Sequence, residues 1–238
     1  MRPLKIAVDI KLLFELEQAK NLLGSNQPLE GAFRNSVFSQ MLQLILRQNK
    51  QLVKFYWLLN CPQEMAHPLA DTLNQMGFCG EAPNLTDPKE IIDYLDRSDL
   101  FFSDDSHLLY EASGRGVLGG YLPKQVLEAD KLTIAFEHRI FMDDYNLAAI
   151  RSWLRVLGHL QKSRCPVRTA LITSSTSSVE KRVIELFQFS HCAINELFFL
   201  AAGNKQDVFR LFGPCLYLEG KKRKERGMAT QGRPLLFV

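Results

Sequence analysis

Apolar residues along the chain fall into short, nearly unbroken runs that are separated by longer stretches with helical periodicity. Each run is brief and rich in β-branched or aromatic residues, which is typical of parallel strands covered on both faces. We expect strands at residues 4–10, 52–59, 99–103, 116–122, 132–136, 167–173, 196–201 and 215–219.

Two of the intervening stretches carry clear amphipathic patterns. The first places on one helical stripe Phe33, Val37, Met41, Leu44 and Ile45. The second does the same with Ile150, Trp153, Leu154 and Leu157. Alternating strands and helices predict an α/β fold with Rossmann-like parallel sheets flanked by helices. In such sheets the chemistry lies at the carboxyl ends of the strands.

The chain also divides into two halves that follow a similar order of elements. We place the seam in the loop at residues 122–130, which gives an N-terminal Rossmann-like half at 1–125 and a C-terminal half at 126–238. Each half has a polar residue after its first strand and an acidic residue after a late strand. An internal duplication is one interpretation, and the general likeness of α/β segments is the other.

Composition narrows the class of protein without naming a function. With 238 residues and 46% hydrophobic residues the chain can bury a sizeable core, and its net charge of +3 suggests no field for binding nucleic acid. The apolar start soon meets Asp9 and Lys11, which argues against a signal peptide, and no run approaches the roughly 20 apolar residues of a membrane span. We therefore expect a soluble, cytoplasmic protein without a membrane partner, and we leave open whether it forms a homo-oligomer.

The five cysteines form no C-x-x-C pair and lie singly in or beside apolar runs. We interpret them as reduced packing residues.

Four segments in the second half resemble, in order, the cytosolic 5′-nucleotidase I family of the haloacid dehalogenase-like superfamily. They are "LTIAF", "ALITSSTSS", "LFFLAAGNK" and "PCLYLEG". The first half is similar to that family through "IAVDIKLLFELE" and "DYLDRSDLFFSDDS", and the closing "GMATQGRPLLF" is similar to its last strand. The resemblance implies a HAD-like fold, hydrolysis of nucleoside monophosphates or binding of another phosphate ligand, and Mg²⁺ as cofactor.

The family's pattern implies a role for each matching residue. Thr173, with Ser174 beside it, matches the hydroxyl that holds a phosphate oxygen at the end of strand two, and Lys205 matches the lysine that neutralises charge. Glu137 stands for the nucleophile and metal ligand at the end of strand one, and Glu219 for the metal ligand after strand four. A plain helix cap also explains the Ser-rich turn, and a solvated loop explains Lys205.

The chain departs from this pattern at the nucleophile and at the acid. The family has aspartates where Glu137 and Arg139 stand, and the extra methylene of glutamate moves its carboxylate outward by about 1.5 Å. Arg139 cannot release a proton near neutral pH, so it cannot act as a general acid. Asp143 and Asp144, which follow, are explained by capping of the next helix, and replacement of the lost acids is the alternative.

The first half offers an alternative site in the same order of residue types. It consists of Asp9, Asn60, Lys89, Asp104 and Asp105. Lys11 occupies the position of the acid there, and "SDDSH" also reads as a helix cap. Two functions therefore remain: a 5′-nucleotidase-type phosphatase with a degraded motif, and a noncatalytic relative that binds a nucleotide, a phosphate ligand or a protein partner.

Overall fold

The computed structural model describes residues 2–48, 50–83, 88–122, 131–141, 147–163, 167–173, 177–199 and 215–218. Within them, the side chains of residues 88, 89, 139, 177–180 and 199 are not described. The strands are β1 (Leu4–Asp9), β2 (Val53–Leu58), β3 (Leu100–Ser103), β4 (Leu118–Tyr121), β5 (Leu132–Glu137), β6 (Val167–Thr173), β7 (Glu196–Phe199) and β8 (Leu216–Leu218). The helices are α1 (Leu16–Gly24), α2 (Val37–Gln48), α3 (Gln63–Gln75), α4 (Pro88–Asp96), α5 (Ser106–Gly114), α7 (Leu147–Lys162) and α8 (Ser177–Phe189). Short 3-10 turns are η1 (Ile10–Leu12), η2 (Leu29–Ala32) and η3 (His138–Phe141).

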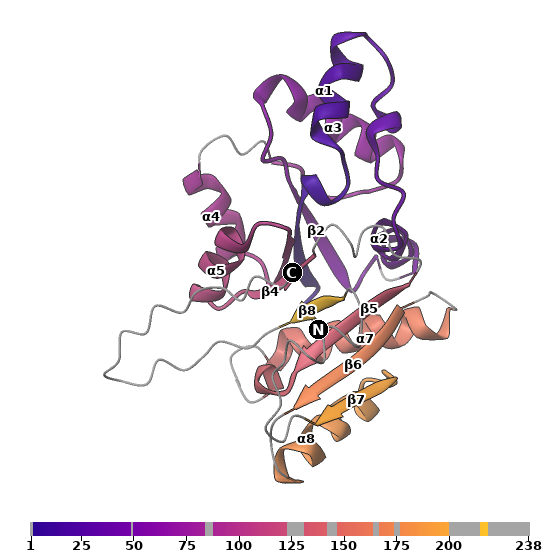
Figure 1. The fold of residues 1–238 in the computed structure, drawn as a ribbon, viewed down its shortest axis with the longest axis vertical. Helices are drawn as coiled ribbons and strands as arrows, with labels where there is room; N and C mark the ends of the chain where they lie inside the picture. The colour runs from indigo at the N-terminus through magenta and orange to yellow at the C-terminus, as the bar shows by residue number, and fades with distance from the viewer. Residues whose placement is uncertain are drawn as a thin grey trace.

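The strands within the described residues all join one eight-stranded sheet in the order β2-β1-β3-β4-β8-β5-β6-β7, which confirms the predicted α/β, Rossmann-like fold (Figure 1). Neighbouring strands are parallel except at β4 and β8, where the two halves meet antiparallel through Gly120 and Tyr121. The predicted parallel pairing holds within each half, and the antiparallel contact joins one half to the other. Pairing the edge of one half with the edge of the other removes two exposed strand edges, and the hydrophobic pattern does not determine its direction.

The two halves pair their strands in the same register. β1 pairs with β2 along Leu4–Asp9, and β5 pairs with β6 along Leu132–Glu137. On their other sides, Ile6–Val8 pair with β3 and Ile134–Phe136 pair with β8. Asp9 and Glu137 are therefore equivalent positions at the ends of two central strands. This equivalence favours the interpretation of an internal duplication.

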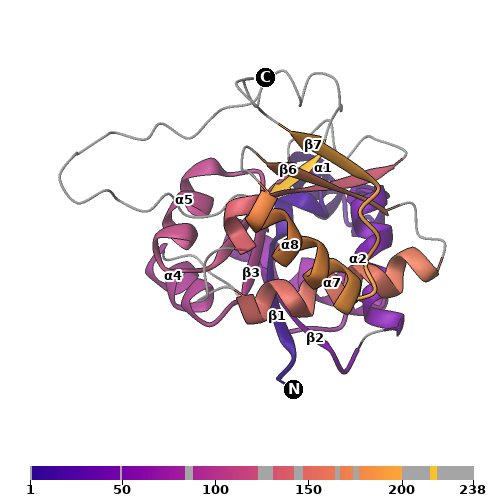
Figure 2. The same ribbon diagram turned by 90° about the horizontal axis from the view of Figure 1, so that it is seen from below.

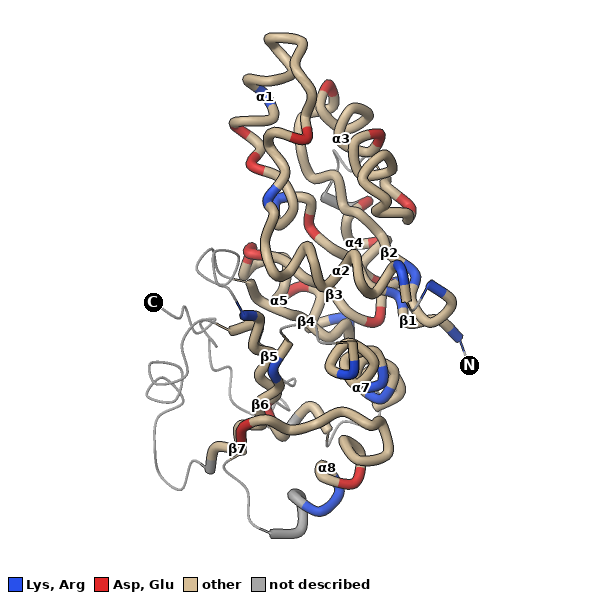
Figure 3. The backbone as a smooth tube through the Cα atoms, turned by 90° about the vertical axis from the view of Figure 1, so that its right-hand side faces the viewer, with Lys and Arg blue, Asp and Glu red and all other residues tan. Residues whose placement is uncertain are grey.

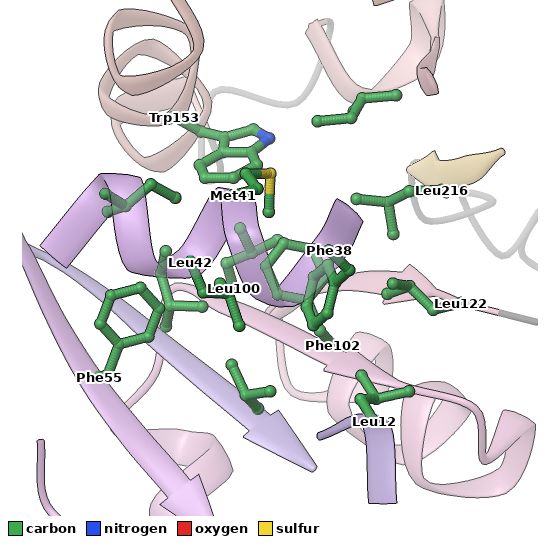
Figure 4. Close-up of a cluster of buried hydrophobic side chains, with 14 of the residues drawn as sticks. Leu12, Phe38, Met41, Leu42, Phe55, Leu100, Phe102, Leu122, Trp153 and Leu216 are labelled. Atoms are coloured by element: carbon green, nitrogen blue, oxygen red, sulfur yellow. The ribbon is translucent and has the colours of Figure 1, made fainter. Parts of the chain in front are cut away.

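Helices α2 and α7 contact each other on one face of the sheet (Figure 2). One large apolar cluster lies beneath them and runs across both halves (Figure 4). Phe102 of β3 lies 5.4 Å from Phe38 of α2 and 5.7 Å from Trp153 of α7, as measured between ring centroids. Leu216 of β8 belongs to the same cluster. The predicted stripe of α7 is confirmed, because Ile150, Trp153, Leu154 and Leu157 are all buried. A second cluster, on the opposite face of the first half, lies between the strands and helices α4 and α5.

The stripe predicted for α2 is wrong at its first position. Ser36 and Ser39 exchange hydrogen bonds between side-chain oxygens and backbone amides at 3.1 and 3.0 Å, and this reciprocal cap starts the helix at Val37. Phe33 therefore lies outside α2. Its ring packs instead on Phe14 at 5.5 Å and on Phe78 at 5.4 Å.

These aromatic contacts belong to a helical lobe built from residues 10–36 and α3, which lies beyond the carboxyl ends of β1 and β2 (Figure 1). Helix α3 contains Glu64 and Asp71 but no Lys or Arg, whereas α7 contains Lys and Arg but no acidic residue (Figure 3). None of the described helices has both the length and the apolar character needed to span a membrane.

The described cysteines are free thiols, as expected. Cys192 and Cys215 are buried, and Cys61 is half-buried. Cys79 is exposed, so its interpretation as a packing residue is wrong. It follows the turn at Gly77, whose φ is positive at 83°, and the fully buried Phe78.

Candidate functional site

Glu137 and Thr173, the two predicted site residues with described side chains in the second half, end neighbouring parallel strands. Glu137 pairs in register with Ile172, the residue before Thr173. Both side chains are nearly inaccessible to solvent, at 2% and 1% exposure. The structure therefore places both residues at the carboxyl ends of neighbouring strands, on the sheet edge where ligands bind in open α/β folds.

Three aromatic rings fix the turn that follows Glu137. Phe136 of β5, Phe141 of η3 and Phe187 of α8 lie 5.6–5.9 Å apart, as measured between ring centroids. Because all three rings are fully buried, η3 is held against the sheet directly after the strand. The apolar residues of "FEHRIF" thus hold Glu137 at the edge of the sheet.

Several residues predicted for this site lie outside the described residues. They are Ser174, Lys205 and Glu219, together with Asp143 and Asp144. Arg139 lies in η3 without a described side chain. Their predicted roles stay predictions.

The opposite edge of the sheet carries a second polar cluster, which is centred on Asp9 at the end of β1. Asp9 is 1% exposed, and the Ser103 hydroxyl at the end of β3 donates a 2.9 Å hydrogen bond to its Oδ2. The backbone N–H of Lys11 donates to its Oδ1 at 3.1 Å. The backbone N–H of Asp105 in turn donates to Ser103 Oγ at 3.0 Å. These bonds link the ends of two central strands.

Burial is the main influence on the protonation of Asp9. It raises the pKa of this carboxyl to about 6, against the lowering effects of the Lys11 amide and charge and of the Ser103 hydroxyl. The charge of Asp104 raises it further. Burial, with the nearby carboxylates of Glu64 and Asp9, also raises the pKa of the Cys61 thiol to about 11. Cys61 is therefore a protonated thiol near neutral pH.

Of the residues predicted for the alternative site, the structure places some near Asp9 and gives Asp105 a different role. Asp104 acts on Asp9 through its charge, and half-buried Asn60 follows β2, the strand next to β1. Asp105 instead caps α5, because its Oδ1 accepts the backbone N–H groups of His107 and Leu108 at 2.8 and 3.3 Å. Lys89 lies in the first turn of α4, and its side chain is not described.

Sequence reasoning missed two members of this cluster, Ser103 and Cys61. Ser103 ends the apolar run "LFFS", and its significance appears only when β3 pairs beside β1. A polar residue at the last position of a buried strand was the available signal.

Neither edge shows a complete metal site within the described part of the chain. There, no group of three or more His, Cys, Asp and Glu side chains could hold a metal ion. Glu137 is the carboxylate described at the β5 edge, and a Mg²⁺ ion needs further oxygen ligands. Glu219, the other predicted metal ligand, lies outside the described residues, so the expectation of Mg²⁺ stays a prediction.

The comparison with known proteins points to the second half of the chain. Residues 145–231 match the family model of 5′-nucleotidases, a range that includes Thr173, Lys205 and Glu219 but begins after Glu137. This range covers less than half of the chain. A search of curated proteins gave no match. The second half is therefore similar to a 5′-nucleotidase domain, and this similarity supports a 5′-nucleotidase-like protein.

Proposed function

We propose that this protein is a 5′-nucleotidase-like protein that binds the phosphate of a nucleoside monophosphate at the carboxyl edge of β5 and β6. The observation that carries the proposal is the juxtaposition of Glu137 and Thr173 at adjacent strand ends, in a half that matches the 5′-nucleotidase model from residue 145 onward. The matched order of strands is consistent with this site, since β6 and β8, the second and fourth strands of the half, flank β5.

In the proposed site, each group has a physical task. The Thr173 hydroxyl donates a hydrogen bond to a phosphate oxygen. Helix α8 starts shortly after β6, and the amide groups of a helix N-terminus attract an anion. Lys205 would neutralise negative charge on the phosphate, as its match to the family lysine suggests.

Hydrolysis is the second candidate function, and the buried Glu137 carboxyl at the strand end favours it. In that reaction a Glu137 oxygen would bond to phosphorus while the bond from phosphorus to the nucleoside oxygen breaks. The leaving oxygen then needs a proton, which Arg139 cannot supply near neutral pH. Water would release phosphate from Glu137 afterwards. We therefore propose that ligand binding is retained and that turnover is slow or lost.

We keep Mg²⁺ as a proposed cofactor that the family resemblance implies. When bound, it would offset the repulsion between an anionic nucleophile and an anionic phosphate. No step above depends on it, because the described residues supply only Glu137 as a ligand at this edge.

Ligand binding by the whole chain tests the proposal. AMP, IMP and inorganic phosphate are added with and without Mg²⁺, and thermal unfolding is followed. A ligand at 100 times its Kd adds about 2.7 kcal/mol to the free energy of unfolding. Thr173→Val should weaken AMP binding about tenfold, since it removes one hydrogen bond to a charged group.

Thr72→Val is the matched control, because Thr72 is a buried threonine of α3 whose hydroxyl donates to Pro68 O at 2.8 Å. It should bind AMP as the unaltered chain does. Absence of any shift with AMP, IMP or phosphate would overturn the proposal, and so would equal shifts for the Thr173→Val variant and the unaltered chain.

A further inference from the structure

The outward side of α7 carries a stripe of basic side chains. The stripe consists of Arg151, Arg155, His159 and Lys162. Successive members are three or four residues apart, so all of them fall within about 80° of arc around the helix axis. Arg155 is half-buried and the others are exposed, whereas the opposite side of the helix is buried in the large apolar cluster. Helix α7 contains no acidic residue that could offset these charges within the helix (Figure 3).

The end of α2 adds a further cation to this surface. The hydroxyl of Ser163, directly after α7, donates a 2.7 Å hydrogen bond to Gln48 Oε1 in the last turn of α2, so the carboxyl ends of the two helices meet. Arg47, the residue before Gln48, is exposed. The ion pairs between described side chains do not involve Arg47, Arg151 or Lys162.

The helix dipole explains only part of this arrangement. It stabilises cations in the last turn of a helix, where Arg47 of α2 and Lys162 of α7 lie. Arg151 and Arg155 lie in the first half of α7, where the dipole does not stabilise a cation. Their spacing of four residues also places two like charges side by side, which disfavours the helix. A surface that keeps this repulsion is therefore a candidate for binding an anion.

An exposed aromatic ring lies beside the stripe. Phe189, at the end of α8, is 67% exposed, and its ring centroid lies 5.5 Å from the guanidinium carbon of Arg155. Phe187, two residues earlier, is fully buried, so α8 has apolar contacts with the core without the ring of Phe189. An exposed ring beside an arginine offers a flat surface on which a nucleobase can stack.

We propose that the basic face of α7, which consists of Arg47, Arg151, Arg155, Lys162 and Phe189, binds single-stranded nucleic acid. The cations contact backbone phosphates, and the Phe189 ring stacks on a base. A single strand fits this surface because its bases are free to leave their neighbours and contact the ring. An acidic peptide would satisfy the cations but would not use the ring.

The net charge of the whole chain, +3, does not indicate such a partner, because it sums acidic and basic surfaces. The fold concentrates cations on α7, whereas α3 contains Glu64 and Asp71 but no Lys or Arg (Figure 3). A local field of this kind attracts a polyanion although the chain as a whole is close to neutral. The basic face of α7 includes none of the residues of the proposed nucleotide site, so the two proposals are independent.

Fluorescence anisotropy of a labelled single-stranded RNA of about 16 nucleotides measures binding to the full chain. With four phosphate contacts, the affinity should fall about 50-fold between 50 and 200 mM salt, since each contact releases counterions. Single-stranded DNA of the same sequence is measured in parallel, and binding of either strand supports the proposal.

Two kinds of variant separate the charges from the ring. Arg151→Gln and Lys162→Gln should each weaken binding about fivefold and make the log–log salt slope shallower by about 0.7. Phe189→Ala should weaken binding of the single strand at least about fivefold, leave the salt slope unchanged and leave binding of duplex RNA unaffected. Phe189→Tyr, which keeps a stacking ring, should bind as the unaltered chain does.

Lys20→Gln is the matched control, because it removes the same charge from an exposed position of α1. It should bind RNA as the unaltered chain does. An equal loss for Lys20→Gln and Arg151→Gln would overturn the proposal, and so would absence of binding at about 100 µM protein and 50 mM salt. Full retention of binding by Phe189→Ala, or displacement of the RNA by polyglutamate as effectively as by unlabelled RNA, would instead identify an acidic protein as the partner and refute nucleic acid.

Discussion

The Ser103 hydroxyl lies 2.9 Å from Asp9 Oδ2 and ties the end of β3 to the end of β1. This bond connects two residues from distant parts of the chain. One of them is Asp9, and burial raises the pKa of its carboxyl to about 6. A carboxyl that is costly to ionise at a strand end is typical of a functional position, where stability is sacrificed for chemistry.

Asp9→Asn should make the protein more stable at neutral pH. The pKa of Asp9 is about 6 in the folded protein and 3.8 when unperturbed, so the folded state holds the proton more tightly. The contribution of Asp9 to stability is therefore greatest below pH 3.8 and is lost as pH rises towards 6, by at most about 3 kcal/mol. Urea unfolding of both proteins between pH 4 and 7 measures this, and a difference that does not change with pH would contradict it.

Ser103→Ala should destabilise the fold by about 1–3 kcal/mol, because it leaves the Asp105 amide without its acceptor and Asp9 Oδ2 without its donor. It should also raise the pKa of Asp9 further, since the Ser103 hydroxyl lowers it. Ser25→Ala is the control, as its hydroxyl donates to the backbone on the exposed end of α1. Equal unfolding midpoints for the two variants in urea would refute the role of Ser103.

Gly158→Ala should destabilise the protein although alanine normally favours a helix by about 1 kcal/mol over glycine. A Cβ at position 158 would lie 2.5 Å from the backbone oxygen of His191, so α7 would have to move from the turn after α8. We expect a loss of about 1–3 kcal/mol. Gly24→Ala, in α1, meets nothing within 4 Å and should be neutral or stabilising. Thermal unfolding compares them, and a gain in stability for Gly158→Ala would show that the helix can shift freely.

Introducing the two aspartates that the resemblance to 5′-nucleotidases implies tests whether Glu137 and Arg139 limit hydrolysis. The double variant Glu137→Asp with Arg139→Asp shortens the nucleophile by about 1.5 Å and supplies a group able to protonate the leaving oxygen. Phosphate release from AMP in the presence of Mg²⁺ should rise at least about tenfold over the unaltered chain, which is the low end of a general-acid contribution. Adding Thr173→Val should reverse the gain. A folded double variant that binds AMP without faster release would show that Glu137 and Arg139 do not limit hydrolysis.

Much of the fold could be predicted because burial on both faces makes the strands visible in the sequence. The run "LTIAF" appears as β5, and its extension by one residue brings Glu137 into the strand. The prediction that Thr173 ends β6 beside this strand is likewise confirmed, because the carboxyl ends of parallel neighbours coincide.

What could not be predicted depends on contacts between distant segments. The antiparallel pairing of Gly120 and Tyr121 with β8 leaves no trace in local pattern, and neither does the bond that joins Ser103 to Asp9. The start of α2 was missed for a different reason: the reciprocal bonds of Ser36 and Ser39 outweigh the helical spacing that suggested Phe33.

Because β4 and β8 are antiparallel, the carboxyl ends of the strands in the two halves lie at opposite edges of the sheet, and each edge can change independently in evolution. Substitutions at one edge of the sheet lie far from the opposite edge, although the strands of both halves contribute to one large apolar cluster. A duplicated unit arranged in this way can forfeit a reaction on one side and refine recognition on the other, with the common core setting the only limit on how far the two drift apart.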